Sequence, residues 1–285
     1  MQAISAIERS TDPIDLRRQS AVAVAIGVLA QIGIPLVHGH GRTVLTIAAV
    51  LSLFLAAVLH ALSESALAML VSLGVLCGGG LLIEAVGVRS GLPFGSYEYT
   101  RGLGLQIIGV PVVVPLAWMM LGWPAFVAAR KVGNAPLVGA AILTTWDLLL
   151  DPQMVKAGYW VWKPTSFPKL NGIPLSNAIG WAIVSALMMW ALDRLVDVDV
   201  VSDGMPLLVL TWTWFSSILG ALVFGLSKPL VGVVGGIAFT IALAPVALRT
   251  FNDVQRRSVA RQRRSPAAAP ARRPAPGGSR STSLE

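Results

Sequence analysis

Eight apolar segments are the feature of this sequence that most restricts its fold. Each is long enough to cross about 30 Å of hydrocarbon as a helix, although the fifth is short unless its flanks are counted. Only 13% of the residues are charged, against roughly 25% in soluble domains. We expect an all-α, multi-pass membrane protein with about eight transmembrane helices, seven being the alternative. The segments are 21–37, 44–62, 66–86, 107–129, 136–150, 174–192, 206–224 and 229–248.

The two ends of the chain are polar. Residues 1–20 contain no apolar core that leads to a cleavage site, so we expect no cleaved signal peptide. Residues 251–285 are rich in Pro, Ala, Arg and Ser without an apolar face, a composition typical of disorder. The expected parts are a cytoplasmic segment (1–20), a transmembrane helical domain (21–250) and a disordered basic tail (251–285).

Positive charge predicts the orientation. With eight crossings, fifteen lysines and arginines fall on the side of the termini and seven on the other. Such residues concentrate on the cytoplasmic side, so we expect both termini to be cytoplasmic and the protein to lie in the cell (inner or plasma) membrane. Nine of the fifteen belong to the tail, and without them the counts are six and seven. No aromatic residue lies among the arginines from Arg256 onward, which favours contact with membrane lipid over nucleic acid.

A polar, aromatic loop and a related segment further along the chain indicate a repeat. The first loop, GLPFGSYEYTRGLGLQIIGVPVVVPLAW, covers residues 91–118. Chance similarity is the alternative, because glycine and aromatic residues are common at membrane interfaces. A true repeat, 84–118 and 147–181, would give two parallel helix–loop–helix units, with both loops on one membrane face and both acids in one cavity. An offset of 63 residues pairs Glu84 with Asp147, Gly95 with Gly158, Tyr97 with Trp160, Tyr99 with Trp162, and Trp118 with Trp181.

Acidic side chains in apolar segments are the strongest functional candidates. A charged group at the bilayer centre costs about 2.5–3.5 kcal/mol and usually faces a cavity or a partner, which singles out Glu84 and Asp147. Asp151 lies one turn beyond Asp147, and because it precedes a proline it could simply end the helix. The other interpretation places the acids in interfacial water or in ion pairs with Arg89, Lys156 or Lys163.

The aromatic residues and one amide are candidate binding groups. Four of the aromatics could equally form a belt at the level of the lipid headgroups. Trp118 and Trp181 lie deeper, where packing or a ligand wall is expected, and Asn177 could bond a carboxylate or another helix. The candidates are Tyr97, Tyr99, Trp118, Trp160, Trp162, Asn177 and Trp181.

We expect neither a metal site nor a cofactor. His38, His40 and His60 are too few and too scattered for a di-iron centre. The sequence has no phosphate-binding loop motif and no convincing dinucleotide fingerprint.

Several motifs together resemble the integral-membrane carotenoid biosynthesis family, which includes hydratases of the bisanhydrobacterioruberin type. They are PFGSYEYT, GVPVVVPLAW, WDLLLDP, GYWVW and GIPLSNAIGW, between about residues 84 and 181. The resemblance implies addition of water to the terminal isopropylidene double bond of an acyclic carotenoid, with other carotenoid-pathway enzymes as partners. We therefore expect Asp147 to be the acid and Glu84 or Asp151 to orient or deprotonate water, since a desolvated carboxyl group can donate a proton at neutral pH.

Two other functions fit parts of the sequence. Asp147 and Asp151, with Asp193 and Asp197, resemble the paired aspartates that bind magnesium diphosphate in intramembrane prenyltransferases. The expected topology places these two pairs on opposite membrane faces. A transporter or carotenoid-binding scaffold also fits a parallel repeat, and it predicts carboxylates near the bilayer midplane.

Overall fold

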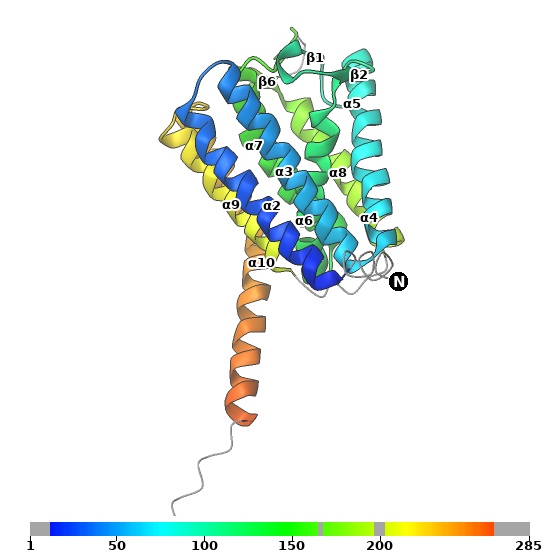
Figure 1. Ribbon diagram of the computed structural model, residues 1–285. Coiled ribbons are helices and arrows are strands. Elements are labelled where there is room, and N and C mark those ends of the chain that lie inside the picture. The colour runs from blue at the N-terminus through cyan, green and yellow to red at the C-terminus, as the bar shows by residue number, and fades with distance from the viewer. Residues whose placement is uncertain (1–11, 165–167, 197–202, 265–285) are drawn as a thin grey trace, which may run out of the picture. The chain divides into compact units, whose positions relative to one another are not determined.

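The computed structural model describes residues 12–164, 168–196 and 203–264, with the side chains of 259–264 left out. In this part of the chain the protein is a bundle of helices with short strands at one end (Figure 1). The described residues up to Ala247 form one compact unit, which holds every site discussed below. From Leu248 onward a second unit begins. The expected all-α class of a multi-pass membrane protein is confirmed.

Every expected apolar segment contains a helix. Seven helical spans in the described ranges are long and apolar enough to cross a membrane. The remaining segment forms α7 (Ala140–Lys156), which has 17 residues and follows a π-helical segment, Ala135–Gly139. The other helices are α2 (Pro13–Gly33), α3 (His40–Glu64), α4 (Ala66–Ser72), α5 (Gly79–Ser90), α6 (Val113–Val132), α8 (Leu175–Leu195), α9 (Gly204–Leu222) and α10 (Pro229–Arg264).

Several helix boundaries differ from the sequence-based expectation. Helix α2 begins at Pro13 instead of residue 21, because the Asp12 side chain accepts the Ile14 N–H (2.8 Å) as an N-cap and proline suits the first turn. Helix α6 begins at Val113 instead of 107, since the preceding residues form a hairpin. Helix α10 continues to Arg264, past the expected start of the disordered tail. Residues 265–285 of that tail, and 1–11 of the N-terminal segment, lie outside the described residues, and the orientation of the termini stays a prediction.

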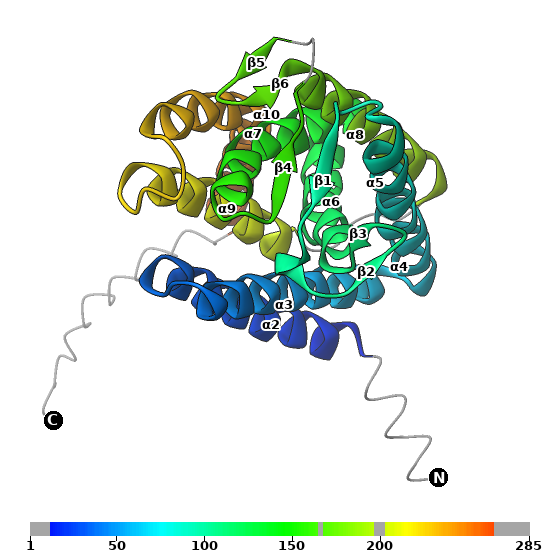
Figure 2. The same ribbon diagram turned by 90° about the horizontal axis from the view of Figure 1, so that it is seen from above.

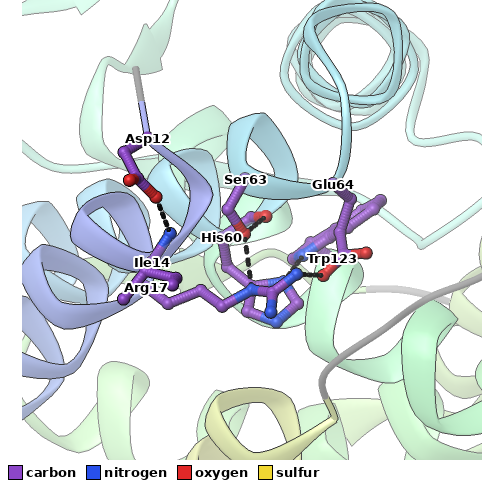
Figure 3. A network of polar contacts seen from close by, with 7 residues as sticks. All are labelled: Asp12, Ile14, Arg17, His60, Ser63, Glu64 and Trp123. Carbon is purple, nitrogen blue, oxygen red and sulfur yellow. Dashed lines mark hydrogen bonds and ion pairs between the residues drawn. The ribbon is translucent and has the colours of Figure 1, made fainter. Parts of the chain in front are cut away.

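Helix α6 lies in the middle of the bundle, with α2 and α3 on one side and α8 on the opposite side (Figure 2). Its side chains Trp118, Met119, Trp123 and Phe126 are among the largest that are fully buried. At the end away from the strands, polar contacts tie three helices together (Figure 3). Arg17 of α2 pairs with Glu64 of α3 at 3.2 Å. The Trp123 Nε1–H of α6 donates to His60 Nδ1 of α3 at 3.0 Å, so His60 has a structural role here.

The strands lie at positions that are related by the 63-residue offset. Strand β1 (Tyr97–Tyr99) pairs antiparallel with β4 (Trp160–Trp162), which places the two loops side by side on one face. Each loop then forms its own hairpin before the next helix. The first joins β2 (Gln106–Ile107) to β3 (Val110–Pro111), and the second joins β5 (Lys169–Leu170) to β6 (Ile173–Pro174).

The backbone conformation repeats as well. Ile108 and Asn171, at equivalent positions, both have positive φ (49° and 55°), and the glycines that follow have φ of 88° and 87°. A π-helical segment also precedes the acid-bearing helix in each copy, at Leu73–Gly78 and Ala135–Gly139. In the register of the paired strands Glu98 faces its own equivalent, Val161. The two copies therefore meet about a local two-fold axis.

Gly180 of α8 tests how firmly the first loop is packed on the bundle. A β-carbon there would lie 2.7 Å from the Phe94 ring and 3.1 Å from the backbone carbon of Pro93. We expect Gly180→Ala to destabilise the protein by about 1–3 kcal/mol, because rigid neighbours must move. Thermal unfolding of the purified protein measures this. The control is Gly74→Ala, whose β-carbon meets nothing within 4 Å; equal stability of the two variants would contradict the packing argument.

Candidate active site

A cavity of about 200 Å³ lies between the paired strands and the helices. Its walls come from both copies of the repeat and from α2, α3 and α9. All of the site residues predicted from the sequence line it, which confirms that both loops and both acids converge on one space. These residues are Glu84, Tyr97, Tyr99, Trp118, Asp147, Asp151, Trp160, Trp162, Asn177 and Trp181.

Glu84 is the acid of the first copy and lies midway along α5. It is 5% exposed. Its Oε2 accepts hydrogen bonds from the hydroxyls of Tyr97 (2.5 Å) and Tyr99 (2.8 Å). Its Oε1 accepts the indole N–H of Trp118 at 3.3 Å. Three neutral donors therefore surround this carboxyl group.

The second copy holds two acids on one face of α7. The indole N–H groups of Trp160 (2.5 Å) and Trp162 (3.2 Å) donate to Asp151 Oδ1. The Asn177 amide of α8 donates to Asp147 Oδ2 at 2.7 Å and to Asp151 Oδ2 at 3.0 Å. One nitrogen atom thus joins the two carboxyl groups, and Asp147 receives a single donor whereas Asp151 receives three.

The ion-pair interpretation of these acids does not hold in the described structure. The Lys163 ammonium pairs with the exposed Glu98 at 2.9 Å. The Lys156 ammonium donates to the Gly225 carbonyl, and the Arg89 guanidinium donates to the Ala85 carbonyl. Among the described residues that line the cavity there is no lysine, arginine or histidine. The acids are therefore stabilised by neutral donors rather than by cations.

The four aromatic side chains of the paired strands line the cavity. Burial raises the pKa of the Tyr97 and Tyr99 phenols well above the usual value, and the nearby Glu84 carboxyl raises it further. Both phenols keep their protons and act as donors. Deeper in the cavity, the rings of Trp118 and Trp181 stack with centroids 4.2 Å apart and planes 8° from parallel. These two residues are equivalents in the repeat, so the stack also lies on the local axis.

The two copies differ in the number of acids that they supply. Val88 occupies the position equivalent to Asp151, and Val114 the position equivalent to Asn177. The aromatic pair of the first strand consequently donates to Glu84, whereas the pair of the second strand donates to Asp151, one turn beyond the equivalent of Glu84. The site is asymmetric although the backbone is nearly symmetric.

The donor set does not suit a metal ion. No group of three His, Cys, Asp or Glu side chains in the described ranges is arranged to hold one. Hydrogen bonds from O–H and N–H donors occupy three of the roughly four lone-pair sites on each of Glu84 and Asp151.

The sequence pattern of the family described as "Carotenoid biosynthesis protein" matches residues 41–243 of this chain. The chain belongs to this carotenoid biosynthesis family. A bisanhydrobacterioruberin hydratase of Haloarcula japonica is 30% identical over 149 residues, which are 46% of this chain and 50% of that protein. The chain thus matches half the length of this relative. No solved structure is significantly similar to the chain.

The family match encloses both copies of the repeat and the ten site residues that were predicted from the sequence. Several other lining residues were not singled out by the sequence, because isolated polar side chains in apolar helices belong to no motif. Their only signal is that they are polar at positions that could face lipid. They are Gln31, Thr46, Gln153, Thr213, Ser216 and Ser217.

The three tyrosines of the chain provide a matched test of the donors to Glu84. Hydrogen bonds to a charged group contribute about 1.5–3 kcal/mol, against about 0.5–1.5 kcal/mol for neutral pairs. We expect Tyr97→Phe to lower the unfolding free energy more than Tyr159→Phe, whose hydroxyl bonds the Thr43 hydroxyl at 3.2 Å and no other group in the described part of the chain. Chemical or thermal unfolding measures the difference, and a larger loss in Tyr159→Phe would refute the assignment.

Proposed function

We propose that this protein adds water to the terminal isopropylidene double bond of an acyclic carotenoid. The observation that carries the proposal is one cavity in which three buried carboxyl groups face aromatic walls. Membership of the carotenoid biosynthesis family supports a carotenoid as the substrate, and the name of the relative from Haloarcula japonica supports a hydration.

The size of the cavity supports reaction at the end of the molecule. A space of about 200 Å³ accommodates a small branched hydrocarbon end group, not a whole polyene. The remainder of the substrate lies between apolar helix surfaces and lipid. The carbon atoms that reach the acids are thus those of the terminal double bond.

The hydrogen bonds support different roles for the acids. Three negative charges in an apolar cavity without a cation repel strongly, so at least one carboxyl group carries a proton. Donors stabilise the ionised form, and Glu84 and Asp151 each accept three. Asp147 accepts one, and its Oδ1 has no partner among the described residues. We assign the proton to Asp147.

The first step is protonation of the alkene. The O–H bond of Asp147 breaks, and the π-electron pair forms a new C–H bond at the carbon that bears one hydrogen. A tertiary cation remains at the carbon that bears two methyl groups. Aromatic faces stabilise a desolvated cation by about 0.5–2 kcal/mol each, and Trp118, Trp181 and Trp162 line the cavity.

The second step is attack by water. A lone pair of the water oxygen forms the C–O bond, and one of its protons passes to the Asp151 carboxylate. The product is a tertiary alcohol, and the aspartate pair holds one proton at the end as at the start. Since both carboxyl groups bond the Asn177 amide, the proton returns over a short path, and coupled acids of this kind share their titration.

Two variants test the proposal in a host that makes the unhydrated carotenoid. We expect Asp147→Asn and Asp151→Asn to reduce formation of products heavier by one water by about 10²–10⁴-fold, as loss of a general acid or base does. The matched controls are Asp193→Asn and Glu98→Gln, which alter acids at the far end of α8 and on the outer side of β1. Full hydration by both site variants, at protein levels equal to the controls, refutes the proposal.

The prenyltransferase alternative conflicts with the positions of its aspartates. Asp193 pairs with Arg130 near the C-terminal end of α8, whereas Asn177, which contacts Asp147, lies in its first turn. At 1.5 Å per residue these positions are roughly 24 Å apart along the helix. Asp197 lies outside the described residues.

Magnesium dependence separates these enzymes. We expect a magnesium chelator to leave carotenoid hydration by isolated membranes unchanged, because Asp147 and Asp151 face protein N–H donors. Product masses report the result. Loss of turnover on chelation that magnesium restores supports the diphosphate chemistry, and pigment that is retained without any change of mass supports a binding protein.

A further inference from the structure

A second cavity adjoins the site. Its volume is about 260 Å³, and it lies at the strand-bearing end of the bundle, where α2 ends and α3 begins. It borders the first cavity, since the two share several lining residues. These are Ile34, Thr46, Gln153, Met154 and Leu226.

The outer part of this second cavity is charged. His38, Arg42 and Lys156 line it, whereas the first cavity has no basic side chain among its described lining residues. The Arg42 and Lys156 side chains bond to the carbonyls of Val37 and Gly225, which holds them at the rim. A hydrocarbon that passes these fixed cations removes water from them, which is unfavourable. Water that passes them solvates them instead.

Polar groups continue across the boundary between the cavities. The Thr46 hydroxyl donates to the Arg42 carbonyl (2.9 Å), which leaves its oxygen able to accept. The Gln153 amide donates to the Leu149 carbonyl (3.0 Å), and its oxygen accepts no hydrogen bond from the described residues. Ser216 and Ser217 also line the first cavity. A water molecule needs two to four such partners, and these polar side chains can provide them.

We propose that the second cavity is the route by which water enters the site from the strand-bearing face. As a supply of the reactant it rests on the hydratase proposal, but the route itself is testable without any reaction. It separates the two reactants physically, since water arrives past Arg42 and Lys156 while the carotenoid arrives from the hydrocarbon.

The test uses the chemistry of thiols. Cys77 is the single cysteine, so Cys77→Ala gives a background in which Thr46→Cys and Gln153→Cys are introduced separately. A charged, membrane-impermeant methanethiosulfonate reagent is added to either face of sealed vesicles, and labelling rates are measured by mass. Leu105→Cys, at a residue 76% exposed beside the strands, marks the strand-bearing face. Leu51→Cys, on the outer surface of α3 and 46% exposed, is the lipid-facing control.

We expect both boundary thiols to react from the face that labels Leu105→Cys, at least about tenfold faster than Leu51→Cys, because thiolates form in water and not in lipid. Met154→Cys replaces either variant if it fails to accumulate. Rates equal to those of Leu51→Cys, or reaction only from the opposite face, overturn the route. If the boundary thiols are labelled but the protein never hydrates carotenoids, the proposed function is refuted and the water route stands. If the protein hydrates carotenoids but the boundary thiols do not react, the route is refuted and the proposed function stands.

Discussion

The burial of carboxyl groups without cations is the constraint on which the rest of this structure depends. An acid inside an apolar bundle needs hydrogen-bond donors or it destabilises the fold. Here the donors are phenols, indoles and the Asn177 amide, and most of them project from β1 and β4. Those strands reach the acids because they pair with each other across the top of the cavity. The loops, the repeat and the site are therefore parts of one arrangement.

The acids and the aromatic loops of the site can be predicted from the sequence, whereas the hairpins and several other lining residues cannot. Glu84 and Asp147 stand out because acids are costly in apolar segments, and the offset of 63 places the two aromatic loops together. The hairpins were missed, since Ile107 and Val110 are as apolar as the helix that follows. The turn between β2 and β3 has positive φ at Ile108 and Gly109, and hydropathy carries no information about backbone conformation. Thr46 and Gln153 were missed because single polar residues have no pattern, and the cavity they line depends on α3 and α7 coming together in space.

The difference between the copies has a physical basis. In a symmetric pair of sites every acid would have the same donors and the same tendency to ionise. The first copy has valine at 88 and 114, where the second copy has Asp151 and Asn177, and this difference removes the equality. Acid–base chemistry needs groups that differ in protonation at one pH. A duplicated scaffold provides the shared cavity, and substitutions in only one copy make its two halves chemically distinct.

The position of the stacked tryptophans on the local axis has a consequence for a substrate with two similar ends. A cavity on a two-fold axis exists once per chain, not once per repeat. On the proposed function, a carotenoid modified at both termini must withdraw, reverse in the bilayer and bind again. Singly modified pigment is then a free species that lipid and any competing enzyme can intercept. The ratio of mono- to dihydroxylated pigment would thus depend on how long a carotenoid stays near the protein between two visits.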